Sequence, residues 1–417
     1  MTAPLSGVRV LSLTHYLQGP SCVQYLADLG ADVIKVERIG GAYERHWSGA
    51  KAYLDDQSVF FLMAGRNQRS VEIDLSTPEG SDALWKLIES ADVLVENFRA
   101  GTLDRRGYSY EEVKKRNPRI VYCSLTGYGS TGPAKSKPGQ DLLIQSLSGL
   151  AMLTGRAEDP PMPVGTAIVD QHAATLGALG ILAALLQRNA TGEGVKVDSN
   201  LLSAALNLQL EPLNYHLNGA KLWDRSASGV GSRFHQAPYG TYQTSDGWLT
   251  MSLSDGATLA KAFEDEKFAS WTRDDQFDHR EEVNSRVVEH MKTKTTAQWQ
   301  EIFEGHGVWY AAVREYDEVL ADPQVAANQS VIEYDDPEVG RVRVLAHPVQ
   351  YDGKVPGLTR RPPAPGEHTG EVLRELGYSD GDLESLRANN SIGPDRNSVR
   401  FDRASSAPAS SYSRKKA

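Results

Sequence analysis

The sequence predicts an α/β protein with two domains: a doubly wound parallel sheet and a smaller α+β domain. Three observations lead to this prediction. Over the first 200 residues, short runs rich in Val, Ile and Leu alternate with longer segments of helical periodicity. Residues 226–240 (SASGVGSRFHQAPYG) then mark a shift to glycine-rich, irregular sequence. The length of 417 residues exceeds what one hydrophobic core normally holds.

The first strand–helix–strand unit sets the pattern. Residues 8–13 form a short apolar run that predicts a buried strand, 21–29 predict a helix ended by Gly30, and 32–37 predict a second strand. A unit of this length predicts a right-handed crossover between parallel strands. Its first turn, THYLQGP, lacks the G-x-G-x-x-G fingerprint of a dinucleotide site, which argues against a nicotinamide or flavin enzyme.

The same alternation continues along the first domain. Further strands are predicted at 70–75, 93–98, 120–125 and 196–198, and helices at 79–91 and 110–116. Ligands of a doubly wound sheet bind at the carboxyl ends of its strands. The loops expected to carry a site are therefore 14–20, 38–50, 97–107 and 126–140.

Five segments follow from this pattern. They are a sheet domain at 1–200, a helical linker at 201–225, a small α+β domain at 226–325, a return segment at 326–390 and a tail at 391–417. The small domain is predicted to hold a hairpin at 241–253 and helices near 257–267, 281–293 and 296–305. A helix near 369–376 is expected to pack on the large domain. The polar, Ser/Arg-rich tail is expected to be disordered.

Charge and cysteine usage limit the setting of the protein. The formal net charge of -10 argues against nucleic acid or an anionic membrane as the main partner, although a local basic pocket stays open. The longest apolar run, 176–186, is shorter than the roughly 20 residues of a membrane span, and the N-terminus lacks the features of a signal peptide. Cys22 and Cys123 have no paired spacing, so a reducing, cytoplasmic setting is expected.

Several kinds of catalytic site are disfavoured by the motifs. The histidines are scattered, and no HExxH or Cys/His cluster predicts a metal site. The chain contains no G-x-S-x-G elbow and no GxxxxGK[ST] loop, which argues against a serine hydrolase and a P-loop enzyme. Carboxylates and basic residues near the predicted sheet edge remain as candidates.

Two of those carboxylates open consecutive apolar helical runs. Asp141 begins DLLIQSLSGL, and Asp170 precedes QHAATLGALGILAALL. An aspartate in this position fits a helix N-cap, which contributes about 1 kcal/mol. By pattern alone the cap is the favoured interpretation, and the same position also supports a nucleophile, because a helix N-terminus stabilises the ionised form. The pattern alone leaves both interpretations open.

Basic residues gather on or near the same predicted loops. They are Arg38, Arg66 and Arg69 in GRNQRS, Arg105 and Lys137. Each fits a solvated surface charge, and as a group they also fit a phosphate-rich ligand.

Motifs spread along the chain resemble the family III CoA-transferases. They are GVRVLSLTHYLQGP, LGADVIKVER, GRNQRSVEIDL, ADVLVENFRAGTLDRRG, TGYGSTGP and the block from KPGQDLLIQSLSG to VGTAIVDQHAATLGALGILAAL. The resemblance runs from about residue 5 to 210 and resumes weakly at APYGTYQTSDGW and APGEHTGEVLRELGYS. The family includes formyl-CoA transferase, carnitine CoA-transferase and α-methylacyl-CoA racemases. The combined motifs are specific, whereas any one alone is not.

The resemblance implies a Rossmann-like large domain, an interlocked homodimer and sites between large and small domains. It also implies that CoA passes from an acyl-CoA to a free carboxylic acid, with coenzyme A bound as substrate and no metal. Asp170 falls at the position of the nucleophile that forms a covalent aspartyl intermediate, and Asp141 at that of a supporting acid. Residues 229–231 resemble a glycine-rich lid, with an interdomain linker as the alternative.

The resemblance further places CoA contacts at six positions and shows two departures. The CoA positions are His15, Arg38, Arg69, Asn97, Arg105 and Lys137. Gln140 stands where the racemase branch has a histidine, which disfavours racemisation because an amide does not exchange protons at neutral pH. Leu17 stands where formyl-CoA transferase has a glutamine, and Gln18 follows it, which puts formate and oxalate in doubt as substrates.

Three hypotheses therefore compete. The first is a CoA-transferase, with Asp170, Asp141, Gln140 and Gln18 in its catalytic centre. The second is an α-methylacyl-CoA racemase or epimerase, and the third is a non-catalytic CoA-binding or structural protein.

Overall fold

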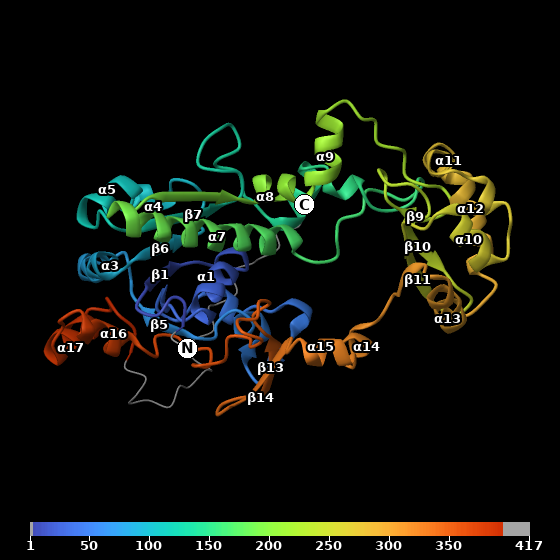
Figure 1. Cartoon of the computed structure of the whole chain (residues 1–417). Coiled ribbons are helices and arrows are strands. Elements are labelled where there is room, and N and C mark those ends of the chain that lie inside the picture. Colours follow the sequence, from blue (N-terminus) through green and yellow to red (C-terminus); the bar gives the residue numbers. More distant parts are fainter. Residues whose placement is uncertain (1–2, 395–417) are drawn as a thin grey trace, which may run out of the picture. The chain divides into compact units, whose positions relative to one another are not determined.

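A computed structural model describes residues 3–394, which form two compact units (Figure 1). The first unit comprises the chain up to 139, 170–204 and the chain from 324 onward, and the second comprises 140–169 and 205–323. This division differs from the predicted one, since 140–169 and 205–225 both group with the second unit. Hydrogen bonds explain the grouping: Gln209 Nε2 donates to Ser148 O, and Arg225 Nη1 donates to Thr154 O.

The first unit is built on a six-stranded parallel sheet with the order β5-β2-β1-β6-β7-β8. Its strands are β1 (Arg9–Leu13), β2 (Asp32–Glu37), β5 (Gln68–Glu72), β6 (Val93–Glu96), β7 (Val121–Thr126) and β8 (Lys196–Asn200). Val10 of β1 lies beside Val33 of β2 on one side and Val93 of β6 on the other. Strand β1 is therefore internal, and later strands of the chain lie on both sides of it. The predicted α/β class with a large parallel sheet is confirmed.

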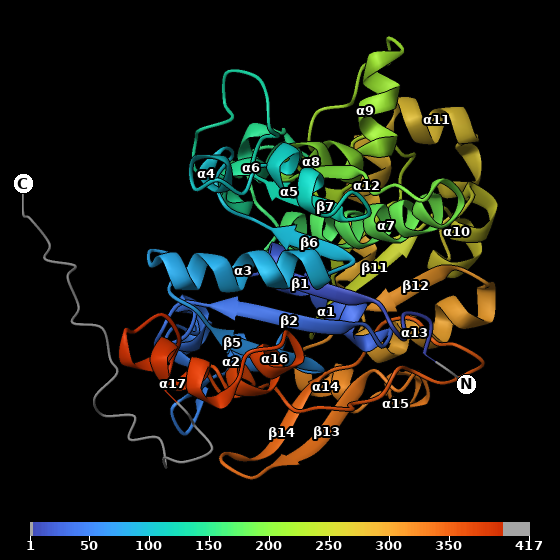
Figure 2. The same cartoon turned by 90° about the vertical axis from the view of Figure 1, so that its left-hand side faces the viewer.

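Helices cover both faces of this sheet (Figure 2). One face packs on α3 (Pro78–Ser90), α5 (Tyr110–Arg116), α16 (Thr369–Glu375) and α17 (Asp380–Ala388). The other packs on α1 (Gln18–Asp28) and α7 (Ile168–Thr191). Helix α3 begins with a proline, as predicted, and Thr77 caps it by accepting from Gly80 N–H at 3.1 Å.

Helix α7 is the most apolar long helix of the described part. It has 24 residues and a window of mean hydropathy 1.4, so by length and composition it is long enough to cross a membrane, unlike the shorter run seen in the sequence. Its residues Ala174, Ala178, Ile181 and Leu185 repeat at helical spacing and are buried against the sheet. Burial in the core of the first unit therefore accounts for the apolar character of this face.

The predicted return segment contains a hairpin that the sequence interpretation missed. Strands β13 (Val331–Asp336) and β14 (Gly340–Leu345) pair antiparallel, and the alternating sequence around Asp-Pro-Glu-Val-Gly was the available signal. Residues 391–394, assigned to a disordered tail, are described: Ile392 bridges Ile73 and is buried. Residues 395–417 of that tail lie outside the described residues.

The second unit centres on an antiparallel sheet with the order β12-β11-β10-β9. Its elements include β9 (Val230–Gly231), β10 (Gly240–Gln243), β11 (Trp248–Ser252), β12 (Trp309–Ala312), α10 (Gly256–Phe263), α11 (Arg273–Asp278), α12 (Arg280–Met291) and α13 (Thr296–His306). The aromatic side chains of Phe263, Phe268, Trp299 and Phe303 fill its core. The predicted hairpin corresponds to β10 and β11.

The stretch 229–231, predicted to be a lid or a linker, ends in an edge strand. Gly231 of β9 pairs with Gly240 of β10, and a Cβ on Gly240 would lie 2.8 Å from Gly231 Cα. Close strand pairing therefore accounts for Gly231 and Gly240.

Truncation of Ile181 in α7 should destabilise the protein. The side chain is fully buried between the helix and the sheet, so Ile181→Ala should lower the free energy of unfolding by about 2–5 kcal/mol through lost contacts and a residual cavity. Chemical denaturation measures this change. The control Gln187→Ala, exposed on the same helix, should change it by less than about 0.5 kcal/mol. Equal losses in the two variants would contradict the packing of α7.

Candidate active site

The strand order reverses between β1 and β6, which is where a doubly wound sheet opens a crevice. The loops that leave these two strands are joined there by a reciprocal pair of hydrogen bonds. His15 N–H donates to Asn97 Oδ1, and Asn97 Nδ2 donates to His15 O, both at 2.8 Å. The structure thus brings together two predicted CoA contacts and gives the Asn97 amide a role in holding the His15 backbone.

Two helices begin at this edge of the sheet. Gln18 is the first residue of α1, and Asp170 lies in the first turn of α7. Gln171 Nε2 donates to Ser21 Oγ at 3.2 Å, so the first turns of the two helices are in contact. Helix N-termini carry partial positive charge and orient N–H groups outward, and two of them together favour an anionic ligand.

Gln18 has an unsatisfied donor beside this crevice. The side chain is buried, and its Nε2 has no hydrogen-bond partner among the described residues. Gly19 lets α1 approach the loop closely, because a Cβ there would lie 2.5 Å from Thr14 Cβ and 3.0 Å from Asn97 Cγ. A buried donor of this kind suits a ligand oxygen, since leaving it unpaired costs free energy.

The two aspartates of the sequence analysis have different roles in the structure. Asp141 is the first residue of α6 (Asp141–Leu147) rather than its N-cap residue, which is Gln140. Its Oδ2 accepts from the backbone N–H of Val169 at 2.7 Å, and its Oδ1 accepts from Gln145 Nε2 at 2.6 Å. Val169 immediately precedes Asp170. Asp141 therefore caps α7, and it fixes the backbone next to the predicted nucleophile.

Glycines bring the segment before Asp141 to the end of β7. A Cβ on Gly127, the first residue after β7, would lie 2.6 Å from Gly139 Cα, so the two backbones are in contact. Gln140 follows Gly139 directly and lies at the N-cap of α6, without a side-chain capping bond. The glycine of TGYG thus serves close backbone approach, and the turn residues Gly129 and Gly132 have positive φ.

Three predicted phosphate ligands follow the carboxyl ends of strands. Arg38 follows β2, Arg105 ends the short helix α4 (Thr102–Arg105) after β6, and Lys137 follows β7. All three side chains are exposed. Arg38 Nε donates to Gly41 O at 3.0 Å, and Arg105 Nη2 donates to Thr102 Oγ1 at 3.2 Å. Their positions agree with a ligand that spreads over this edge.

Arg69 lies near the opposite, amino-terminal end of the sheet. Its guanidinium pairs with Asp32 at 2.6 Å, Glu375 at 2.6 Å and Glu371 at 2.9 Å. Burial acts to lower the pKa of Arg69, but these carboxylates raise it above its ordinary value. The side chain fastens α16 to β5, and this placement separates it from the other predicted CoA contacts.

Glu96 is the last residue of β6 and immediately precedes Asn97, and it was not among the predicted site residues. Its carboxyl group accepts from Phe98 N–H at 2.9 Å and from the Ser124 hydroxyl. Burial raises the pKa of Glu96 to about 7, so this group titrates near neutrality. The one feature of the sequence that could have indicated a role for Glu96 is a charged residue at the end of the apolar run VLV.

Substitution of Glu96 should give a pH-dependent gain in stability. The folded-state pKa exceeds the ordinary 4.5, so wild-type folding loses free energy as the pH rises from 4.5 to about 7. In Glu96→Gln the amide can accept from Phe98 and donate to Ser124, without that loss. We expect a gain on the order of 3 kcal/mol above pH 7 and none near pH 4, measured by denaturation at both values. A gain independent of pH would contradict the assignment.

Comparison with known proteins identifies the family. The profile of CoA-transferase family III matches residues 5–369. A succinyl-CoA:glutarate CoA-transferase of Mus musculus is 34% identical, covering 92% of this chain and 89% of that protein. A formyl-CoA:oxalate CoA-transferase of Rhodopseudomonas palustris is 31% identical, covering 95% and 99%. The crystal structure of a CAIB/BAIF family protein from Brucella suis superposes with a TM-score of 0.78 at 30% identity, covering 90% and 100%. The chain belongs to CoA-transferase family III and is an enzyme of that family.

Proposed function

We propose that this enzyme moves CoA from an acyl-CoA to a free carboxylic acid through a covalent intermediate on Asp170. One observation carries the proposal: Asp170 lies in the first turn of α7, where the contact with α1 joins two helix N-termini at the sheet's switch point. The N-terminus of α7 favours the carboxylate form of Asp170, which is the nucleophilic form.

The reaction balances without any further reactant. A carboxylate oxygen of Asp170 attacks the donor thioester carbonyl, the C–S bond breaks, and a mixed anhydride and CoA thiolate result. The thiolate attacks the Asp170 carbonyl, which gives an aspartyl-CoA thioester and frees the donor acid. The acceptor carboxylate then attacks this thioester, which breaks the C–S bond and gives a second mixed anhydride and CoA thiolate. The thiolate attacks the acceptor carbonyl of that anhydride, which gives the acceptor's CoA thioester and frees the Asp170 carboxylate. Covalent catalysis of this kind divides one difficult exchange into easier steps.

The neighbouring residues support these steps in distinct ways. Asp141 fixes the start of α7 through the Val169 N–H, and the Gln18 amide donor suits an oxygen of the acyl group. His15, held by Asn97, and the exposed Arg38, Arg105 and Lys137 suit the CoA moiety, because arginine and lysine pair well with phosphates. Gln140 replaces the proton-exchanging histidine of the racemase branch, which disfavours racemisation.

We propose small dicarboxylic acids as substrates. The mouse relative is named for succinyl-CoA and glutarate, both of which carry a second carboxylate. Leu17 in place of the glutamine of formyl-CoA transferases argues against formate and oxalate, although a relative named for them is also similar. A panel of acceptors against succinyl-, acetyl- and formyl-CoA distinguishes these substrates.

We further propose a cytoplasmic homodimer. Both cysteines are buried free thiols, and burial raises the pKa of Cys22 to about 12, so neither is suited to disulfide exchange. Large apolar side chains exposed on the second unit, such as Leu217 at 71% and Trp309 at 67%, are typical of a surface covered by a partner. Light scattering in solution tests the dimer.

Loss of the Asp170 carboxylate should abolish transfer. Asp170→Asn keeps the shape but not the nucleophile, so kcat should fall by at least about a thousandfold. With succinyl-CoA and hydroxylamine, the wild type should form a hydroxamate that mass spectrometry maps to Asp170. Glu193→Gln, an exposed carboxylate beyond the other end of α7, is the control and should keep full activity.

Three results would count against this proposal. Full activity in Asp170→Asn would exclude the residue as nucleophile. Exchange of an α-deuteron with solvent in the absence of an acceptor acid would indicate a racemase. CoA binding without turnover of any acceptor would indicate a binding protein.

A further inference from the structure

Two buried ion pairs connect β2 to the loop that follows it. In one pair the strand supplies the positive side chain, and in the other it supplies the negative one. Lys35 and Glu37 project from the same face of β2, because they are two residues apart in a strand. The short helix η1 (Tyr43–Arg45) supplies the partners: Glu44 Oε1 lies 2.8 Å from Lys35 Nζ, and Arg45 Nη2 lies 2.6 Å from Glu37 Oε1. All four side chains are at most 8% exposed.

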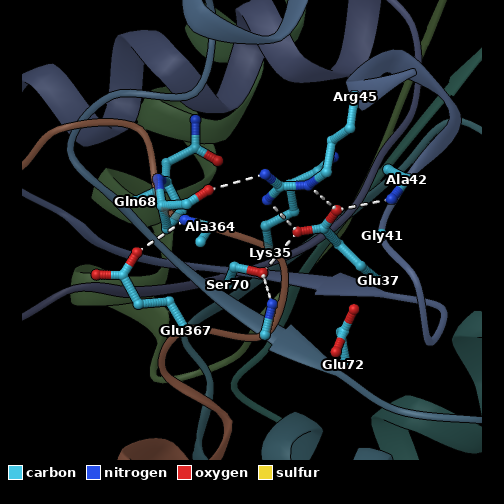
Figure 3. Close-up of polar contacts among 12 residues, drawn as sticks. Lys35, Glu37, Gly41, Ala42, Arg45, Gln68, Ser70, Glu72, Ala364 and Glu367 are labelled. Atoms are coloured by element: carbon cyan, nitrogen blue, oxygen red, sulfur yellow. Dashed lines mark hydrogen bonds and ion pairs between the residues drawn. The ribbon is translucent and has the colours of Figure 1, made fainter. Parts of the chain in front are cut away.

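The Glu37–Arg45 pair holds the loop to the body of the first unit (Figure 3). Glu37 also accepts from Ala42 N–H at 2.8 Å and from Ser70 Oγ at 2.6 Å. Arg45 Nη1 donates to Pro363 O at 2.8 Å. These contacts reach β5 and the C-terminal segment, away from the loop after β1.

The Lys35–Glu44 pair instead reaches the candidate active site. Lys35 Nζ donates to Thr14 O at 2.8 Å, and Glu44 Oε2 lies 3.9 Å from His15 Nδ1. Glu44 Oε2 makes no hydrogen bond with the described residues. A narrow cavity of about 10 Å³ is lined by Tyr16, Pro20, Lys35 and Glu44, so the pair lies directly beneath the loop that carries His15.

A gain in folding stability is a weak explanation for the buried Lys35–Glu44 pair. Removing two charges from water costs several kcal/mol, and apolar residues often replace a buried pair without loss. An apolar pair would not bind Thr14 O, however, and would not place a carboxylate beside His15. The loop also needs support, because Tyr16 has φ of +60°, which few non-glycine residues adopt.

We propose that Glu44, held in place by Lys35, is a positioning residue that fixes the His15 ring and thereby sets the affinity for the CoA moiety. The ring has two neighbours: Glu44 Oε2 lies 3.9 Å from its Nδ1, and the Phe98 ring lies edge-on with its centroid 5.2 Å away. The inference rests on the proposed function only for the identity of the ligand.

Calorimetric binding of free CoA to the full chain tests the inference without turnover. Glu44→Gln should weaken CoA binding about tenfold, because a His15 ring that is no longer held in place must be ordered when CoA binds. The same substitution in a His15→Ala background should have no further effect, since the residue acts through that ring. With saturating acyl-CoA, kcat of Glu44→Gln should stay within about twofold of the wild type.

A third buried ion pair provides the matched control. Asp28 pairs with Arg66 through contacts of 2.9 and 2.5 Å at the far end of α1. Asp28→Asn should lower the Tm, as any broken buried pair does, yet leave the Kd for CoA unchanged. If Glu44→Gln does not fold, Glu44→Asp, which keeps the charge but withdraws it from His15, takes its place in the same cycle.

The possible failures are distinguishable. Additive effects of the Glu44 and His15 substitutions, or equal weakening of CoA binding by Asp28→Asn, would overturn the inference. CoA binding by a wild type that transfers CoA to no acceptor would overturn the proposed function alone. Absence of CoA binding in the wild type would overturn both.

Discussion

The reciprocal hydrogen bonds between His15 and Asn97 join two loops that the sheet topology directs apart. Strand β1 is flanked by β2 and β6, so the chain leaves β1 and β6 toward opposite sides of the sheet. Without a connection, the crevice between these loops would lack a fixed width. The paired bonds set that width, and Gln18 and Asp170 lie in the first turns of the two helices that begin at this edge.

Two hydrogen bonds hold the first turn of α7, and they explain why Asp141 and Asp170 have different roles. Gln171 contacts Ser21 in the first turn of α1, and Asp141 accepts from Val169 N–H. Asp170 lies between these two anchored residues in the sequence. A nucleophile must be held in a narrow range of positions to react efficiently. Capping of α7 by Asp141 thus complements the nucleophilic role that we propose for Asp170.

Local sequence patterns predicted the parallel sheet, its main helices and the position of Asp170 in the first turn of α7. Contacts between distant segments were beyond such patterns. The Asp141 carboxylate caps α7, whose residue Val169 lies 28 positions later in the sequence. The sequence around Arg69 did not reveal at which end of the sheet this side chain lies. The β13–β14 hairpin was missed because the proline in its turn and the Pro-rich sequence that follows suggested a linker, although its alternation was visible.

Charge around the candidate site explains how a protein of net charge -10 can accommodate an anionic ligand. The buried carboxylates nearest the crevice are compensated. Burial alone would raise the pKa of Glu37, yet Arg45 lowers it to about 2, so the pair carries no net charge. Glu44 is paired with Lys35 in the same way.

The negative charge of Glu96 is reduced without an ion pair, since its pKa of about 7 leaves it partly protonated at neutral pH. The exposed Arg38, Arg105 and Lys137 and the two helix N-termini therefore act on this edge with less opposition from Glu37, Glu44 and Glu96 than three free carboxylates would give. Negative charge elsewhere on the surface is screened over about 8 Å at physiological ionic strength. The balance of charge at the sheet edge, rather than that of the whole chain, governs which ligands it favours.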